Sequence, residues 1–219
     1  KYLMHGIQGS LKRFNTEYFD LVYCHRPDPE TPMEEIVWAM HDMIDRGYAL
    51  YWGTSEWGAE DILEAYAVAE KYNLRKPVVE QPQYNLFNRD KVEREFLPLY
   101  EKHQMGLTTW SPLASGVLTG KYLNGQIPEG SRLSLKSMGW LKDEVLNPAS
   151  TQRVEKFVTV AKELSCEPAA LAVAWCLKNK NVSSVITGAT NVEQIHKNMK
   201  ALDVLPKLTD EVMKVLNQI

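Results

Sequence analysis

Short apolar runs alternate with amphipathic stretches along most of this 219-residue chain. Buried strands are predicted at 21–24, 48–52, 77–81, 105–110 and 182–187, where β-branched and aromatic residues gather. Between these runs, apolar residues recur at helical spacing, and the connections are only a few residues long. Repeated strand–helix units with short connections predict a parallel sheet, which is either doubly wound or closed into a barrel.

Helices are expected over 1–14, 31–47, 58–72, 89–103, 151–164, 168–177, 191–202 and 210–216. The clearest start is the sequence Thr-Pro-Met-Glu at 31–34, which has the pattern of a capping box with Thr31 as the cap and a proline in the first turn. The stretch 113–150 is rich in glycine and proline and has no sustained periodicity. We expect a long loop there, and such loops in compact domains are usually functional.

The absence of a phosphate-binding turn separates the two kinds of parallel sheet. A doubly wound nucleotide-binding sheet shows a glycine-rich turn directly after a strand, and the sequence has no G-x-G-x-x-G and no Walker motif. This favours a (β/α)8 TIM barrel, which typically needs eight strands and about 250 residues. We therefore expect residues 1–219 to form a single barrel domain that covers strands 4–8, with three strand–helix units preceding the sequence.

Composition narrows the class of protein further. The net charge is −3 and the pI about 6.0, without a run of Lys or Arg, so neither nucleic acid nor insertion into a membrane is expected. The three cysteines, at 24, 166 and 176, lack metal-ligand spacing and fit buried thiols in a reducing, cytoplasmic compartment. No metal site is expected. A barrel hydrolase or aldolase would need a metal cluster or a buried lysine at a strand end, although fold alone does not exclude one.

A histidine follows the first strand run directly. His25 stands between the run at 21–24 and the turn that begins with Arg26-Pro27. In a parallel sheet the carboxyl ends of the strands line the ligand face, so His25 is expected to point into a site. The alternative is a structural histidine that ends the strand.

A series of motifs occurs along the chain in a fixed order. They are His-Arg-Pro-Asp-Pro (25–29), Thr-Pro-Met-Glu-Glu (31–35), Tyr-Trp-Gly-Thr-Ser (51–55), Glu-Gln-Pro (80–82), Trp-Ser-Pro-Leu-Ala-Ser-Gly (110–116), Leu-Thr-Gly-Lys-Tyr (118–122) and Ser-Ser-Val-Ile-Thr-Gly-Ala (183–189). With them the chain resembles the aldo-keto reductase superfamily, and within it the group of potassium-channel beta subunits and their plant, fungal and bacterial relatives. The resemblance covers essentially the whole chain.

The resemblance implies a barrel that binds NADPH across the carboxyl ends of its strands and reduces aldehydes or ketones to alcohols. It also implies a homotetramer, and as an alternative function a redox-sensing beta subunit of a potassium channel with weak or no turnover. A catalytic quartet of Asp, Tyr, Lys and His is implied as well, of which the sequence covers only the histidine, at His25. The resemblance places an asparagine at this position in the animal channel subunits. At His25 this chain therefore departs from them and is similar to the catalytically competent members of the group.

The resemblance assigns the parts of NADPH to particular residues. The implied cofactor-binding set is Ser55, Gln81, Trp110, Ser111, Leu113, Ser115, Lys121, Arg132, Gly188, Thr190, Gln194 and Asn198. Ser55 and Gln81 match partners of the nicotinamide carboxamide, and Trp110 matches its stacking aromatic, although taken alone it could be a core residue. Main-chain N–H groups near Ser111, Leu113 and Ser115, with the side chains of Lys121 and Arg132, match phosphate contacts.

The remaining members of the set match contacts of the adenosine end. Gly188 leads to Thr190 and Gln194, which match partners of the 2′-phosphate, and Asn198 matches an adenine contact. Thr190, Gln194 and Lys121 together predict a preference for NADPH over NADH. Two positions depart from the animal subunits: Glu56 replaces a basic residue and is expected to weaken phosphate binding, whereas Lys197 replaces an acidic one and is expected to offset this.

Overall fold

The computed structural model describes the backbone of residues 1–219 and the side chains of all residues except 143–145. The chain forms two compact units. Unit 1 comprises Lys1–Pro82 and Asp90–Thr108, and unit 2 comprises Gln83–Arg89 and Thr109–Ile219. That the chain is one barrel domain stays a prediction.

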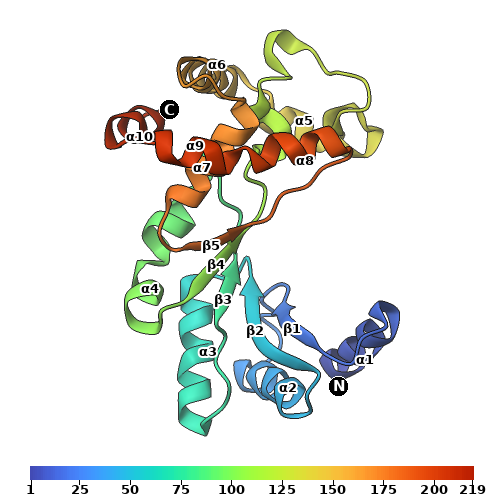
Figure 1. Cartoon of the computed structure of the whole chain (residues 1–219). Helices are drawn as coiled ribbons and strands as arrows, with labels where there is room; N and C mark the ends of the chain where they lie inside the picture. Colours follow the sequence, from blue (N-terminus) through green and yellow to red (C-terminus); the bar gives the residue numbers. More distant parts are fainter. The chain divides into compact units, whose positions relative to one another are not determined.

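Unit 1 is built on a parallel sheet. Its strands are β1 (Phe19–Cys24), β2 (Ala49–Ser55), β3 (Val79–Gln81) and β4 (Gly106–Thr109), whose last residue belongs to unit 2 (Figure 1). The strands pair in chain order, with Cys24 beside Thr54 and Ser55 beside Gln81. The carboxyl ends of β1, β2 and β3 are therefore level with one another.

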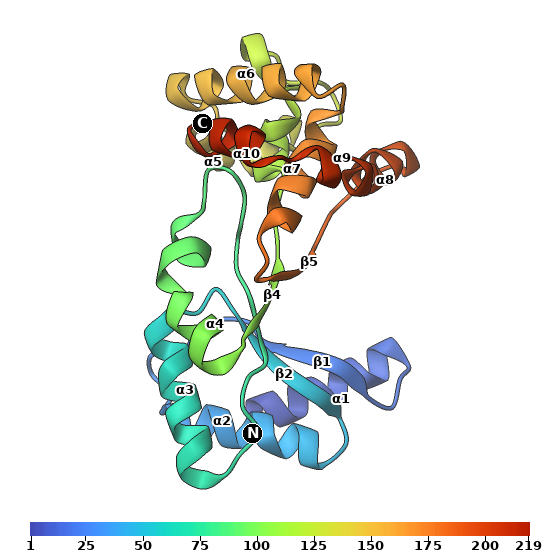
Figure 2. The same ribbon diagram turned by 60° about the vertical axis from the view of Figure 1, so that its left-hand side comes forward.

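Four helices accompany these strands, as the apolar spacing predicts. They are α1 (Tyr2–Phe14), α2 (Met33–Asp45), α3 (Ala59–Tyr72) and α4 (Leu97–His103). Helix α2 buries Ile36, Val37, Met40 and Met43, which recur every three or four residues along one face. It packs against β2 and α3 (Figures 1 and 2). Burial of this face anchors the helix on the sheet.

Two details of unit 1 differ from the prediction. The capping box at Thr31 is wrong: α2 begins at Met33, and the Thr31 hydroxyl donates to Asp28 Oδ2 at 2.7 Å, because the preceding turn competes for it. The helix expected over 89–103 is divided into a single π-helical turn (Lys91–Glu95) and α4. A proline in the first turn of α4 cannot donate the backbone hydrogen bond that would continue the helix.

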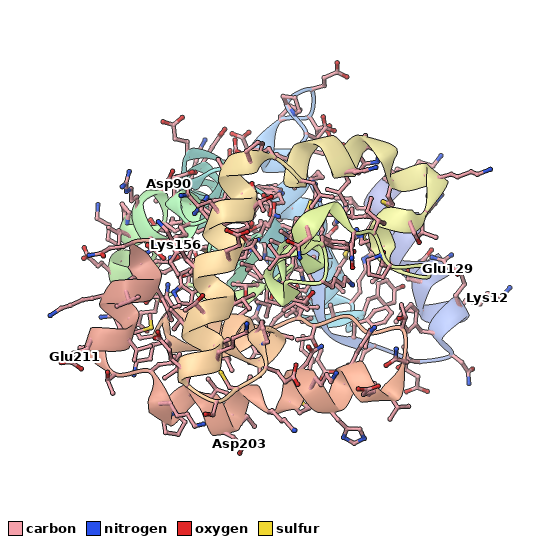
Figure 3. The ribbon with its side chains drawn as sticks, turned by 90° about the horizontal axis from the view of Figure 1, so that it is seen from above. Lys12, Asp90, Glu129, Lys156, Asp203 and Glu211 are labelled. Atoms are coloured by element: carbon pink, nitrogen blue, oxygen red, sulfur yellow. The ribbon has the colours of Figure 1, made fainter. Side chains whose placement is uncertain are left out.

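Unit 2 is organised around a buried helix. Its helices are α5 (Gly139–Val145), α6 (Pro148–Glu163), α7 (Pro168–Lys178), α8 (Val192–Met199), α9 (Ala201–Val204) and α10 (Asp210–Asn217). Residues 170–176 of α7 are all buried, and α7 contacts α6, α8 and α9 (Figure 2). Asp203 on α9 and Glu211 on α10 are exposed (Figure 3).

Strand β5 (Val182–Val185) follows α7 in unit 2, and directly after it the backbone N–H of Ile186 donates to the carbonyl oxygen of Thr109 at 2.7 Å. The parallel pairing of β1 to β4 in chain order, with a helix between successive strands and a further strand after α7, is that of a partial (β/α)8 barrel and confirms the predicted fold class. In the described part of the chain, no helix combines the length and apolar character needed to cross a membrane.

The prediction that 113–150 is a long loop without helices is wrong. It contains the short helical turns Ala114–Thr119, Leu123–Gly125, Arg132–Ser134 and Lys136–Met138, followed by α5. Helix α6 also begins at Pro148, before the expected start, because the Asn147 side chain caps it by accepting from Ser150 N at 2.9 Å. Single helical turns carry too few residues for a periodic pattern, so the sequence does not reveal them.

Candidate functional site

Three of the predicted site residues meet at one edge of the sheet in unit 1. His25 is the first residue after β1, Ser55 is the last of β2 and Gln81 is the last of β3. Because the register places Ser55 beside Gln81 and aligns the end of β1 with β2, the three residues lie in a row at the carboxyl edge. His25 is exposed, Gln81 is half-buried and Ser55 is only 2% exposed.

Hydrogen bonds connect this row. The Ser55 hydroxyl donates to the carbonyl oxygen of Gln81 at 3.0 Å. Arg26 Nη1 donates to the carbonyl oxygen of His25 at 2.6 Å and to Ser55 Oγ at 3.2 Å. Arg26 therefore joins the ends of β1 and β2, a function that the sequence analysis missed. Its position directly after His25 is the only sequence signal that could have found it.

An ion pair lies next to the same edge. Glu56 follows Ser55 in the left-handed region, with φ of 59°, and its Oε2 lies 3.1 Å from Lys91 Nζ on the π-helical turn. Each side chain of the pair is 24% exposed. Lys91, which was not expected from the sequence, reduces the repulsion that Glu56 exerts on an anionic ligand.

A buried carboxyl group precedes Gln81 on β3. Glu80 is 0% exposed and accepts a hydrogen bond from the Thr54 hydroxyl. Burial raises the pKa of Glu80 to about 7, although the hydrogen bond from Thr54 and the charge of Lys91 act in the opposite direction. Glu80 therefore changes its protonation near neutral pH, and the sequence analysis did not single it out.

In unit 2, the segment after β4 forms a tight turn with unusual backbone angles. Ser111, Ala114 and Ser115 have φ values of 57°, 46° and 59°, and Gly116 follows with φ of 91°. The turn is held by hydrogen bonds from Ala114 N to Ser111 O at 3.0 Å and from Gly116 N to Leu113 O at 2.9 Å. Left-handed residues among right-handed ones can turn successive N–H groups to one side, an arrangement that suits anions.

Lys121 folds back toward this turn. A Cβ atom placed on Gly116 would lie 3.2 Å from Lys121 Nζ, so the ammonium group lies close to the Gly116 backbone. Trp110, directly before the turn, is half-buried and pairs with Gln83 in a parallel bridge. Arg132 is exposed at the start of the turn Arg132–Ser134. The structure thus brings Lys121 to Gly116, directly after the predicted phosphate-binding residues Ser111, Leu113 and Ser115.

The start of α8 joins two further predicted residues. Asn191 caps the helix by accepting from Gln194 N at 3.0 Å. Gln194 Oε1 accepts from Thr190 N at 2.8 Å and from Thr190 Oγ1 at 3.3 Å. Thr190 and its neighbour Gly188 are exposed. The pair therefore stands at the amino end of a helix, where backbone N–H groups favour a phosphate.

Asn198, the residue of α8 that is predicted to contact the adenine, is buried. Asn198 is 2% exposed, and its Nδ2 is buried without a hydrogen-bond partner among the side chains that the structure describes. A buried donor without a partner fits a residue that contacts a ligand, but the Asn198 amide must become accessible before it can do so. Lys197 on the same helix lies 2.9 Å from Glu193, which reduces the charge it offers to a phosphate.

The predicted site residues are distributed over both units. His25, Ser55 and Gln81 belong to unit 1, whereas the other cofactor-binding candidates belong to unit 2. Among the residues with described side chains, no group of three or more His, Cys, Asp or Glu side chains could hold a metal ion.

Comparison with known proteins places the chain in a family. The model of the "Aldo/keto reductase family" matches residues 1–219. A protein of Oryza sativa subsp. japonica described as "Probable voltage-gated potassium channel subunit beta" is 56% identical over 213 residues, which are 97% of this chain and 65% of that protein. A protein of Arabidopsis thaliana with the same description is 53% identical over 219 residues, which are 100% of this chain and 67% of that protein.

The chain thus spans about two-thirds of the length of these relatives. The family match extends over every strand and helix described above. The chain therefore belongs to the aldo/keto reductase family.

Proposed function

We propose that the protein catalyses the NADPH-dependent reduction of aldehydes and ketones to alcohols. The observation that carries this proposal is the row of His25, Ser55 and Gln81 at the carboxyl edge of β1, β2 and β3. NADPH supplies a hydride when it is bound. The ring N–H of His25 then donates a hydrogen bond to the substrate oxygen, where negative charge develops in the transition state.

Different residues are assigned to the different parts of NADPH. In unit 1, Gln81 and Ser55 provide hydrogen-bonding groups for the nicotinamide carboxamide, and Trp110 in unit 2 provides an aromatic surface. The turn at 111–116 and the neighbouring Lys121 suit the pyrophosphate, with Arg132 as a further cation.

The adenosine 2′-phosphate is assigned to the Thr190–Gln194 pair at the amino end of α8, and the adenine to Asn198. These contacts favour NADPH over NADH. Equal dissociation constants for the two nucleotides in fluorescence titrations would contradict this preference.

The proposal is tested with the full-length protein, NADPH and a nitrobenzaldehyde, by following the loss of NADPH absorbance. His25→Asn keeps a hydrogen-bond donor at this position but changes its electrostatics. We expect this variant to lower turnover at least about tenfold and to leave the NADPH dissociation constant unchanged, because His25 contacts the substrate oxygen. Unaltered turnover together with weaker NADPH binding would refute the role of His25.

A second candidate function is that of a redox-sensing beta subunit of a potassium channel. The descriptions of the rice and Arabidopsis relatives favour it. In this case the protein binds NADPH, turns over carbonyl compounds slowly or not at all, and forms a cytoplasmic homotetramer. Co-expression with a voltage-gated potassium channel, followed by current recording, tests the partner, and light scattering tests the tetramer. Rapid NADPH oxidation together with unchanged currents would exclude this function.

A further inference from the structure

The buried carboxyl group of Glu80 lies one residue before the proposed carboxamide-binding edge. It has no exposed surface. The carboxyl group accepts hydrogen bonds from the Thr54 hydroxyl and from the backbone N–H of Glu56. Its Oε1 atom is buried without a partner in the described part of the chain. Because burial of an unpaired polar atom is costly, this arrangement calls for an explanation beyond packing.

The two partners of Glu80 flank Ser55 in the sequence. Thr54 precedes Ser55, the last residue of β2, and Glu56 follows it. Glu56 has a φ of 59°, which lies in the left-handed region that is unfavourable for residues other than glycine. The hydrogen bond from Glu56 N–H to Glu80 therefore holds a turn that the backbone does not favour by itself. Ser55, held on both sides, donates its hydroxyl to Gln81 O at 3.0 Å.

Three titratable groups lie around Glu80 on different segments of the chain. Lys91 faces it from the π-helical turn, Glu56 from the end of β2 and Tyr100 from α4. Lys91 is also paired with Glu56 at 3.1 Å, so its charge is shared between the two carboxyl groups. Burial outweighs the hydrogen bonds from Thr54 and Glu56 and the charge of Lys91, and it raises the pKa of Glu80 to about 7. Glu80 is therefore expected to change its protonation near neutral pH.

We propose that Glu80 is a positioning residue, whose buried carboxyl group holds the segment Thr54–Glu56 so that Ser55 and Gln81 are presented to the nicotinamide carboxamide. This inference rests on the proposed function and deepens it, because Glu80 acts on the cofactor only through Ser55 and Gln81. Ionisation of Glu80 adds a negative charge beside the site of an anionic cofactor, so affinity for NADPH falls as Glu80 loses its proton.

Two variants separate these contributions in the full-length protein. Glu80→Gln keeps the size of the side chain and an oxygen for Thr54 and Glu56, but it does not ionise. Thr54→Val keeps the shape of the fully buried threonine and removes the hydroxyl that Glu80 binds. Glu101→Gln on α4 is the matched control, because Glu101 is an exposed glutamate of the same unit.

The measurement is the dissociation constant for NADPH, by fluorescence titration between about pH 6 and pH 8. Thr54→Val is expected to weaken binding about fivefold, which corresponds to the loss of one buried hydrogen bond. The ratio of the NADPH dissociation constant of the wild type to that of Glu80→Gln is expected to rise about fivefold between about pH 6 and pH 8. Because the 2′-phosphate titrates equally with every variant, only ratios between proteins are interpreted.

The outcomes distinguish this inference from the proposed function. Turnover at saturating NADPH, measured on the wild-type protein, reports on the proposed function separately from the NADPH affinity that tests the positioning role. If both variants bind NADPH like the wild type and Glu101→Gln at every pH, the positioning role is overturned and the proposed function stands. If the wild type does not bind NADPH, both fall. Urea unfolding without NADPH confirms that each variant is folded.

Discussion

Replacement of Glu80 by glutamine should change how the stability of the protein depends on pH, even without a cofactor. The folded-state pKa of Glu80 is about 7 because the carboxyl group is buried, and its ordinary value is 4.5. Between these two values the folded protein retains a proton that the unfolded chain has released. The free energy of unfolding contributed by Glu80 therefore falls as the pH rises from about 4.5 to about 7 and changes little beyond.

The magnitude follows from the same two pKa values. Their difference corresponds to about 3 kcal/mol of unfolding free energy, as an order of magnitude. Glutamine cannot ionise, so this contribution is absent from Glu80→Gln. Relative to the wild type, the variant should gain up to about 3 kcal/mol between acidic and slightly alkaline pH.

Urea unfolding followed by tryptophan fluorescence, repeated across this pH range, measures the difference. The comparison uses the wild type, Glu80→Gln and the exposed control Glu101→Gln, whose curve should run parallel to that of the wild type. Parallel curves for the wild type and Glu80→Gln would show that Glu80 titrates at its ordinary pKa. The argument from burial would then be wrong.

Three further predictions address the fold, the cofactor and the thiols. Gly53→Ala should destabilise the protein by about 2 kcal/mol in thermal unfolding, because a Cβ atom there would lie 2.5 Å from both the Val79 side chain and its carbonyl oxygen. Gln194→Ala should lower the ratio of NADPH to NADH affinity about fivefold in fluorescence titrations, since it removes the partner of Thr190. Iodoacetamide should alkylate the half-exposed Cys166 before the two buried thiols, as followed by peptide mass spectrometry, because burial raises all three thiol pKa values, least at Cys166.

Local sequence patterns predicted most of the secondary structure. Helices such as α2 and α3 bury apolar residues at regular spacing, and strands such as β1 are short apolar runs, so each pattern lies within one element. Two predictions were wrong because the sequence patterns extend over only a few neighbouring residues. The cap expected at Thr31 failed because Asp28, outside the motif, takes its hydroxyl, and the single helical turns after Leu113 are too short to show a period.

The tertiary structure alone decided how the site residues are held. Motif resemblance selected His25, Ser55 and Gln81, but their alignment depends on the register of three strands that are separated by whole helices. The contacts of Arg26 with Ser55, of Lys91 with Glu56 and of Glu80 with Thr54 join residues 29, 35 and 26 positions apart. No periodicity or motif spacing records such contacts, because they form only when the pairing of the strands brings distant side chains together.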